Sequence, residues 1–401
     1  MKATVKQDPA ATGRPPGFVD LLPGQAGRRR DLEQTMLARF EAWGYRLIET
    51  PAVELLSTVE TGMQPAALQR LFKMADTDGR MLAMVGERTV PVARAVAGQL
   101  RQAPLPLRLC YLGPTFEGHP AAGRARQGFQ AGAELVGAAG PVADAEVVAL
   151  AVDTLTRCGV TDFQVEVGHV GFFGGIMGRL EEDQRELVLD ALAGRDLVEL
   201  EAALAQTDLR AAEQELLLRF PALRGDASIL EAAGSLVDNP ESAAAIAELG
   251  EVHRLLEAHG AGGRVNLDLG AVRDFDYYSG VIFEVFAPGI GSPLAAGGRY
   301  DGLLERFGYP QPATGVVMFL ERVQALASGV SLEPQQAPVL VGHRGDPADA
   351  IRAAAELRRD GIVAVVEAVA AEEAGLRARA IEQGSRRALL CGPDGRTEIT
   401  P

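Results

Sequence analysis

Residues 107–116, LRLCYLGPTF, and residues 127–135, QGFQAGAEL, determine the expected fold class, because together they predict two paired strands of an antiparallel sheet. The connection between them contains Gly and Pro, which favour a loop. Gln130 and Glu134 lie in the second strand, and since four residues is an even interval, their side chains share one face of the sheet. An amide and a carboxylate on one face form a candidate binding site, whereas a solvated strand edge is the commoner explanation.

The residues before this hairpin predict a leader, a helix and a strand. Residues 1–16 are polar and rich in Pro and Gly, and we expect them to form a flexible leader. Apolar residues recur at helical spacing over 31–43, and residues 45–49 then alternate as a strand. Glu87 and Thr89 follow at an even interval, which predicts that they also share a face of a strand.

The residues after the hairpin predict more helices and strands. Helical periodicity covers 143–157, and residues from about 172 to 260 are dense in Ala, Leu and Glu, which indicates a helical insertion. Residues 265–269 and 277–286 alternate as strands, and we expect them to pair with each other across a turn near Gly270.

The C-terminal third predicts the end of the core and a second domain. A short helix over 297–306 and an apolar helix over 316–326 complete a core that we place at residues 17–328. A linker at 331–337 contains Pro and Gln. Beyond it, strand and helix patterns alternate as β-α-β-α-β, which predicts a small α/β domain over 337–401.

The composition excludes several classes of protein. Hydrophobic residues make up 47% and charged residues 23% of the 401 residues, as in soluble globular proteins. The chain has no signal-peptide pattern and no run of about 18 apolar residues, so we expect a cytoplasmic protein without a membrane partner. A net charge of -15 disfavours nucleic acid. The three cysteines and five histidines show no ligand spacing, and we expect neither a metal site nor a cofactor.

The segment RDFDYYSG at residues 273–280 concentrates the groups most suited to binding. Arg273 can grip a carboxylate with its guanidinium fork, and Tyr277 and Tyr278 add phenol hydroxyls. The combination suits a ligand that has a carboxylate and a polar side chain. A surface cation beside aromatic core residues is the alternative, and the cluster alone favours that alternative.

Four motifs occur in one order and together resemble the histidyl-tRNA synthetase family. The resemblance extends over about residues 16–328. It implies an α+β fold, namely the antiparallel sheet core of class II aminoacyl-tRNA synthetases with flanking helices, a helical insertion and a small C-terminal α/β domain. The matching segments are 17–23 with 44–51 for motif 1, 113–116 with 123–130 for motif 2, 271–280 for the histidine-binding signature, and 297–303 with 318–322 for motif 3.

The resemblance implies a role for each residue of a histidine pocket. Three residues would receive the ligand ammonium, one would grip the carboxylate, and two would bond the imidazole nitrogens. Since unmatched donors and acceptors reject analogues, the set implies histidine itself. In that order the residues are Glu87, Thr89 and Gln130, then Arg273, then Glu134 and Tyr278, with Tyr277 in the same signature.

The nucleotide side departs from the synthetase pattern. Glu117 stands where synthetases have an Arg that bonds the α-phosphate of ATP, whereas Arg322 of motif 3 is retained. The C-terminal domain is shorter than an anticodon-binding domain and not evidently basic, so we expect no tRNA partner. Arg88 and Asp274 stand where synthetases usually have Gly, and the sequence assigns no role to either.

An intact histidine pocket beside an altered nucleotide site is similar to one branch of the family, the regulatory subunits of ATP phosphoribosyltransferase. This resemblance implies a non-catalytic chain that senses histidine for feedback control of the first step of histidine biosynthesis. Its partners would be a separate short-form catalytic subunit and a second copy of the chain as a homodimer. One alternative is an active, divergent histidyl-tRNA synthetase, favoured by Arg273 and Arg322. Another is an amino-acid-activating paralogue that modifies a protein.

Overall fold

The computed structural model describes residues 13–120, 125–194, 196–219, 223–271, 277–327 and 338–401. It divides into two compact units, Met1–Val330 and Ser331–Pro401. Residues 1–12 of the expected leader and the segment that contains Arg273 and Asp274 lie outside the described residues. In the described part of the chain, no helix is both long and apolar enough to cross a membrane.

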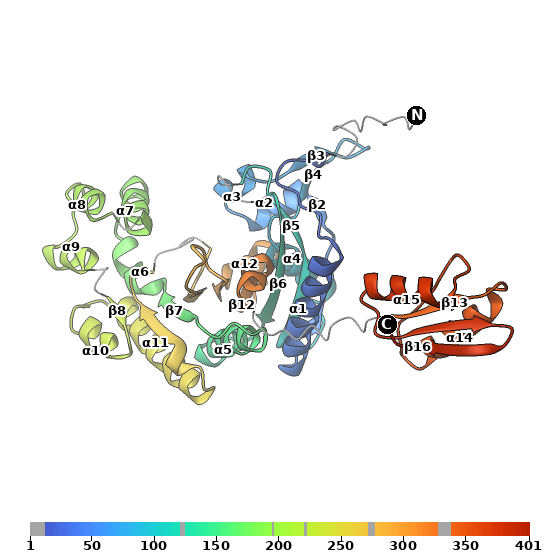
Figure 1. Cartoon of the computed structure of the whole chain (residues 1–401). Coiled ribbons are helices and arrows are strands. Elements are labelled where there is room, and N and C mark those ends of the chain that lie inside the picture. Colours follow the sequence, from blue (N-terminus) through green and yellow to red (C-terminus); the bar gives the residue numbers. More distant parts are fainter. Residues whose placement is uncertain (1–12, 121–124, 195, 220–222, 272–276, 328–337) are drawn as a thin grey trace. The chain divides into compact units, whose positions relative to one another are not determined.

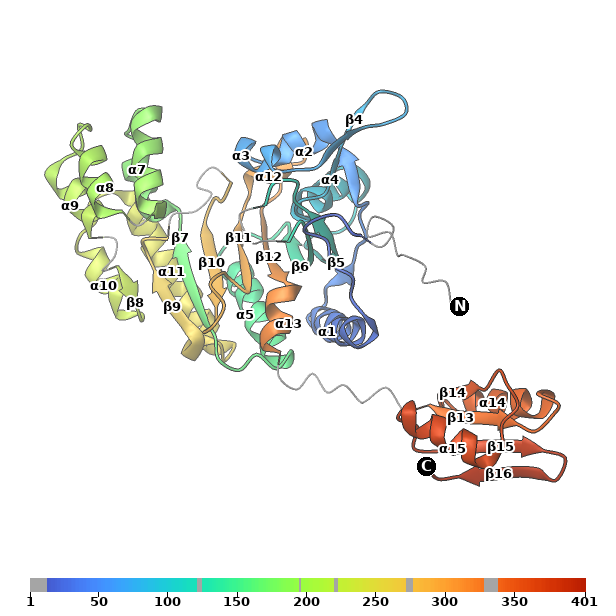
Figure 2. The ribbon, with the colours of Figure 1, turned by 45° about the horizontal axis from the view of Figure 1, so that its top comes forward.

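A nine-stranded sheet forms the centre of the first unit (Figure 1). Its six central strands run antiparallel, in the order β5-β6-β12-β11-β10-β7, whereas β1 joins β5 and β9 joins β7 in parallel. Figure 2 shows β7, β10, β11, β12, β6 and β5 side by side. In sheet order the strands are β1 (Arg46–Leu47), β5 (Leu107–Phe116), β6 (Gln127–Val136), β12 (Ala313–Phe319), β11 (Ala295–Arg299), β10 (Val281–Phe286), β7 (Gln164–His169), β9 (Val265–Asp268) and β8 (Arg224–Gly225).

Helices cover both faces of this sheet, and each face has its own apolar core. One face packs on α1 (Pro23–Ala42) and α5 (Pro141–Arg157) through residues such as Phe40, Leu135 and Leu150, all fully buried. The other face packs on α4 (Thr89–Gln99) and α12 (Gly302–Arg306) through Val90, Tyr111 and Leu303. Because strand residues alternate between faces, Tyr111, Gln130 and Glu134 all belong to this second face.

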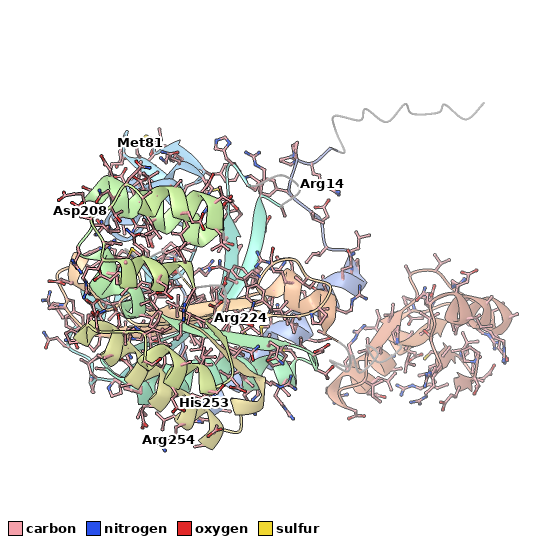
Figure 3. The ribbon with its side chains drawn as sticks, turned by 90° about the vertical axis from the view of Figure 1, so that its left-hand side faces the viewer. Arg14, Met81, Asp208, Arg224, His253 and Arg254 are labelled. Carbon is pink, nitrogen blue, oxygen red and sulfur yellow. The ribbon has the colours of Figure 1, made fainter. Side chains whose placement is uncertain are left out.

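A three-stranded sheet and a helical insertion complete the first unit. The small sheet has the order β2-β4-β3 and lies beside α2 and α3. The insertion runs from α6 to α11 between β7 and β9. Figure 3 views the molecule from its left-hand side in Figure 1, with His253 and Arg254 labelled on α11 and Arg224 on β8. The remaining bounds are β2 (Val53–Leu55), β3 (Lys73–Ala75), β4 (Met81–Met84), α2 (Leu56–Gly62), α3 (Pro65–Gln69), α6 (Gly171–Met177), α7 (Glu182–Gly194), α8 (Leu197–Leu204), α9 (Ala211–Leu218), α10 (Ser228–Gly234), α11 (Pro240–Ala258) and α13 (Leu320–Leu326).

The second unit is a four-stranded sheet with two helices. The strand order is β14-β13-β15-β16, with β13 parallel to both of its neighbours and β16 antiparallel to β15. Its core consists of small and aliphatic residues on both faces of β13. The elements are β13 (Val339–His343), α14 (Ala348–Arg359), β14 (Ala364–Val366), α15 (Glu373–Glu382), β15 (Ala388–Gly392) and β16 (Gly395–Ile399).

The expected hairpin of residues 107–116 and 127–135 is confirmed, but the expected pairing of 265–269 with 277–286 is wrong. Strand β7 lies between them and pairs with β10 in antiparallel and with β9 in parallel. The reason is burial: β7 is buried over Val165–His169, so both of its edges need a partner, and β10 supplies six residue pairs.

The helices expected over 297–306 and 316–326 begin later than predicted. Gly297 lies in strand β11, where a Cβ atom would come within 2.2 Å of the Gly315 carbonyl oxygen, so the close approach of the two strands requires glycine. Residues 313–319 form β12, and the helix starts only at Leu320. An apolar run buried on both faces has no period by which a strand can be distinguished from a helix.

Candidate functional site

The predicted site residues gather on the face of the sheet that carries α4 and α12. Tyr111 projects from β5, and Gln130 and Glu134 project from the same face of the adjacent β6. Glu87 and Thr89 approach from the N-terminus of α4. The structure thus brings together side chains from distant parts of the sequence, and tyrosines that flank β10 and β11 lie next to them.

Glycines in neighbouring strands make room for this cluster. A Cβ atom on Gly132 would lie 2.3 Å from the Tyr111 hydroxyl oxygen, and one on Gly315 would overlap the Glu134 carboxyl. Residues paired across antiparallel strands share a face, and Gly315 is the register partner of Glu134. Because glycine has no side chain, Gly132 and Gly315 leave the space on the sheet surface that the side chains of Tyr111 and Glu134 occupy.

Glu134 is the most buried carboxyl group of the site, with 2% of its surface exposed. The Tyr300 hydroxyl donates a hydrogen bond to its Oε2 atom, and the hydroxyls of Thr89 and Tyr111 lie beside it. Burial raises the pKa of Glu134 to about 8, although these hydroxyls lower it, and the neighbouring Glu87 carboxyl raises it further. At this pKa the Glu134 carboxyl is mostly protonated at pH 7.

Glu87 caps helix α4 and does not lie in a strand, so the expected shared strand face of Glu87 and Thr89 is wrong. Its two carboxylate oxygens accept the backbone N–H groups of Thr89 at 2.8 Å and Val90 at 3.0 Å. Burial raises the pKa of Glu87, whereas these two bonds and the Arg88 guanidinium lower it. The helix terminus thus stabilises an ionised carboxyl group and presents Thr89 to the same cavity.

Three buried polar atoms of the site make no hydrogen bond of good geometry with the residues that the structure describes, although the Thr89 hydroxyl lies close to both Tyr111 and Glu134. They are Tyr111 Oη, Gln130 Oε1 and Glu134 Oε1. A buried polar atom without a partner costs about 1 to 3 kcal/mol, and such atoms are rare in folded proteins. Since all three belong to adjacent strands and one face, a single polar ligand can satisfy them together.

Three tyrosines line the site from the segments just before β10 and just after β11. The rings of Tyr277 and Tyr300 stack at 5.6 Å between centroids, and Tyr278 meets Tyr277 edge to face at 5.0 Å. Burial raises the pKa of Tyr277 and Tyr300 well above the ordinary range, so both remain neutral donors. Arg273 lies outside the described residues.

Sequence reasoning missed Tyr111 and Tyr300. Each carries a weak signal in the sequence. Tyr111 lies two residues before Gly113, where the motif 2 segment begins, and Tyr300 directly follows Gly297–Arg299 within the motif 3 segment. It also missed Arg299, which forms a buried ion pair with Asp144, Nε to Oδ2 at 3.1 Å. Arg299 also holds the segment that carries Tyr277 and Tyr278 in place, because its backbone carbonyl accepts the N–H group of Ser279 at 2.8 Å.

The predicted nucleotide side is a cavity of about 380 Å³ whose lining includes Gln130 of the buried cluster. Glu117 and Arg322 both line it. Glu117 pairs with Arg70, Oε1 to Nε at 3.4 Å, and Arg322 lies over the Phe319 ring and bonds the Pro293 carbonyl. A carboxylate thus occupies the wall where triphosphate oxygens would need cations. In the described residues, no group of three or more His, Cys, Asp and Glu side chains is arranged to hold a metal ion.

The central antiparallel sheet, its motif order and the buried glutamate and tyrosine cluster define a protein of the class II aminoacyl-tRNA synthetase type. The family model of histidyl-tRNA synthetase matches residues 17–323. An ATP phosphoribosyltransferase regulatory subunit of Moorella thermoacetica is 39% identical over 373 residues, which span 92% of this chain and 96% of that protein. One from Rubrobacter xylanophilus is 37% identical over 92% of this chain and 88% of that protein.

Solved structures agree with this relationship. A Bacillus halodurans structure described as an ATP phosphoribosyltransferase regulatory subunit/histidyl-tRNA synthetase superposes with a TM-score of 0.84, at 28% identity, over 95% of this chain and 98% of that chain. A Nostoc histidyl-tRNA synthetase, 21% identical, covers 97% of both chains with a TM-score of 0.77 and shares the fold. The chain belongs to the histidyl-tRNA synthetase family and, within it, to the ATP phosphoribosyltransferase regulatory subunits.

Proposed function

We propose that this chain is the non-catalytic, histidine-sensing subunit of an ATP phosphoribosyltransferase whose active site lies on a separate short-form chain. The observation that carries the proposal is the buried set of unpartnered polar atoms on Tyr111, Gln130 and Glu134. A histidine side chain offers two ring nitrogens and its main chain offers an ammonium group, which match two carboxyl groups, an amide and several hydroxyls.

Each part of the ligand has a proposed receptor. The ammonium group lies between Glu87, Thr89 and Gln130, where the helix-capped carboxylate supplies negative charge. The imidazole ring lies against Glu134 and Tyr278, with Tyr277 beside them. Arg273 binds the ligand carboxylate.

Titration calorimetry with histidine tests this pocket directly. We expect saturable binding of one histidine per chain and much weaker binding of histidinol, which lacks the carboxylate, and of ring-methylated histidines, which cannot make both nitrogen contacts. Equal affinity for all of these compounds, or no binding of histidine, contradicts the proposal.

The non-catalytic part of the proposal rests on the nucleotide cavity. Glu117, which pairs with Arg70, lies in the wall that would contact phosphates, and its carboxylate replaces a cation that would bind a triphosphate. We therefore expect no histidine-dependent exchange of pyrophosphate into ATP and no charging of tRNA. The retained Arg322 favours the second candidate, an active synthetase, and robust exchange by the purified chain would establish it.

The proposed partners are the short-form catalytic subunit and a second copy of this chain. The relatives are named regulatory subunits, which supports a catalytic partner. The motif 1 region around α1 and β1 is the proposed homodimer surface. Light scattering of the chain alone and with the catalytic subunit tests both associations, and a strict monomer that never comigrates with the catalytic subunit contradicts them.

A further inference from the structure

Arg88 is a buried cation beside the pocket whose hydrogen bonds go to neutral oxygens. The side chain belongs to the residue that precedes α4, and 4% of the residue is exposed. Its Nη2 atom donates to the Pro114 carbonyl at 2.9 Å, and Nη1 lies 3.4 Å from the Thr50 hydroxyl. Its Nε atom has no hydrogen-bond partner in the described part of the chain.

Gly113 of β5 leaves the space that the Arg88 side chain occupies. A Cβ atom on Gly113 would lie 2.2 Å from the guanidinium carbon, so only glycine leaves space for Arg88 at this point of the strand. Gly113 is the register partner of Gln130 on β6, and paired residues share a face. The guanidinium thus lies on the pocket face of the sheet, between the α4 terminus and the strand that carries Gln130.

Burying a guanidinium costs several kcal/mol unless a carboxylate is close enough to balance it. The neighbouring carboxylates that act on Arg88 are Glu87 and Glu49, and Glu87 belongs to the pocket. The other ionisable groups that face Glu87 are Tyr111 on β5, Glu134 on β6 and Tyr277. The two tyrosines are neutral, and only Glu134, when ionised, opposes a negative charge there. Arg273 lies outside the described residues.

We propose that Arg88 is a positioning residue of the histidine pocket. Its fork to Pro114 and Thr50 holds the turn that presents Glu87 and Thr89 to the ligand ammonium. The proposal rests on the proposed function of this pocket.

Two substitutions test this role. Arg88→Met keeps an unbranched side chain but removes the fork and the charge, whereas Arg88→Lys keeps the charge and loses the fork. Arg94→Met is the matched control, because Arg94 lies on the same helix and pairs with Glu54 on β2, Nη2 to Oε1 at 2.7 Å, away from the pocket. Histidine affinity is measured by calorimetry at pH 6.5, 7.5 and 8.5, with thermal melting to establish that each variant is folded.

We expect Arg88→Met to weaken histidine binding about tenfold, because the turn that presents Glu87 and Thr89 is then no longer held in place. Arg88→Lys should show a smaller deficit, because its ammonium group keeps a donor but not the fork. Arg94→Met should bind as the parent does.

The outcomes separate this inference from the function on which it rests. A parent chain that does not bind histidine refutes the proposed function, and the inference with it. A parent that binds histidine, with an Arg88→Met variant that binds it as tightly, refutes the positioning role alone. So does an Arg94→Met deficit as large as that of Arg88→Met, because the loss would then follow from removing either arginine.

Discussion

The affinity for histidine should depend on pH in a way that reveals the protonation of Glu134. In the pocket as described, the pKa of Glu134 is raised to about 8, mainly by burial, so this carboxyl carries a proton at pH 7. Free imidazole has a pKa near 6.5 and is mostly neutral at pH 7. If the complex holds one proton between carboxyl and ring, binding neither takes up nor releases a proton between these two values.

The expected affinity is therefore constant from about pH 6.5 to about pH 8. Above pH 8 the Glu134 carboxyl has lost its proton and must regain one when histidine binds, so the affinity falls about tenfold per pH unit. At pH 9 the binding free energy is then about 1.4 kcal/mol less favourable than on the plateau. Below pH 6.5 the ligand must release a proton, and the affinity falls again. Were the pKa of Glu134 at its ordinary value, the decline would begin near pH 6.5.

Calorimetry across pH 6 to 9 in buffers of different ionisation enthalpy measures both the affinity and the protons exchanged. Glu134→Gln is the control, since it removes the titrating group while keeping the shape, and it should abolish the decline that Glu134 causes above pH 8. An affinity that already falls tenfold between pH 6.5 and 7.5 would refute the argument. So would a decline above pH 8 that persists unchanged in Glu134→Gln.

Three other perturbations follow from the same geometry. Gly315→Ala places a methyl group where the Glu134 carboxyl lies and 2.8 Å from the Tyr300 hydroxyl, so calorimetry should show at least about a tenfold loss of histidine affinity, with about 1 to 3 kcal/mol of destabilisation in urea unfolding. Because the pKa of Glu134 is raised, its contribution to the free energy of unfolding is present below pH 4.5 and is lost as the pH rises through 8. The free energy of unfolding of Glu134→Gln should therefore rise by roughly 2 to 4 kcal/mol relative to that of the parent between pH 4.5 and 9. An equal dependence of the two free energies on pH would contradict this. Glu117→Arg removes the partner of Arg70 and should produce no pyrophosphate exchange by itself, because the rest of the phosphate site must also be positioned; restored exchange would show that one charge inactivates the site.

The sequence predicted the strands at residues 107–116 and 127–135, observed at Leu107–Phe116 and Gln127–Val136, because alternation and turn residues are local signals. It could not predict that β7 separates β9 from β10, since the choice of neighbour depends on which edges are left to pair after the helical insertion folds. The helix predicted to begin at Gly297 was misplaced for a related reason. The position of Gly297 in β11 is explained by a backbone approach to Gly315 that only the assembled sheet creates.

The candidate site divides in the same way. Gln130 and Glu134 were placed on one face by their even spacing, which depends on a single strand. Glu87 and Thr89 were assigned to a strand, because nothing in their spacing shows that α4 begins at Thr89. Tyr300 bonds Glu134 from a segment 166 residues away, and such a contact follows from the register of β12 between β6 and β11, not from any local pattern.

The energetic state of this pocket bears on how such a subunit can regulate an enzyme. Three buried polar atoms without a described partner, on Tyr111, Gln130 and Glu134, each cost about 1 to 3 kcal/mol. A ligand that satisfies these atoms stabilises the conformation in which they converge. Since a ligand shifts an equilibrium only by its difference in affinity for the two states, any coupling to a catalytic partner equals that difference. If histidine inhibits the complex, as proposed, the state competent for catalysis must bind it less tightly than the inhibited state, and holding Gln130 or Glu134 away from this arrangement would have that effect.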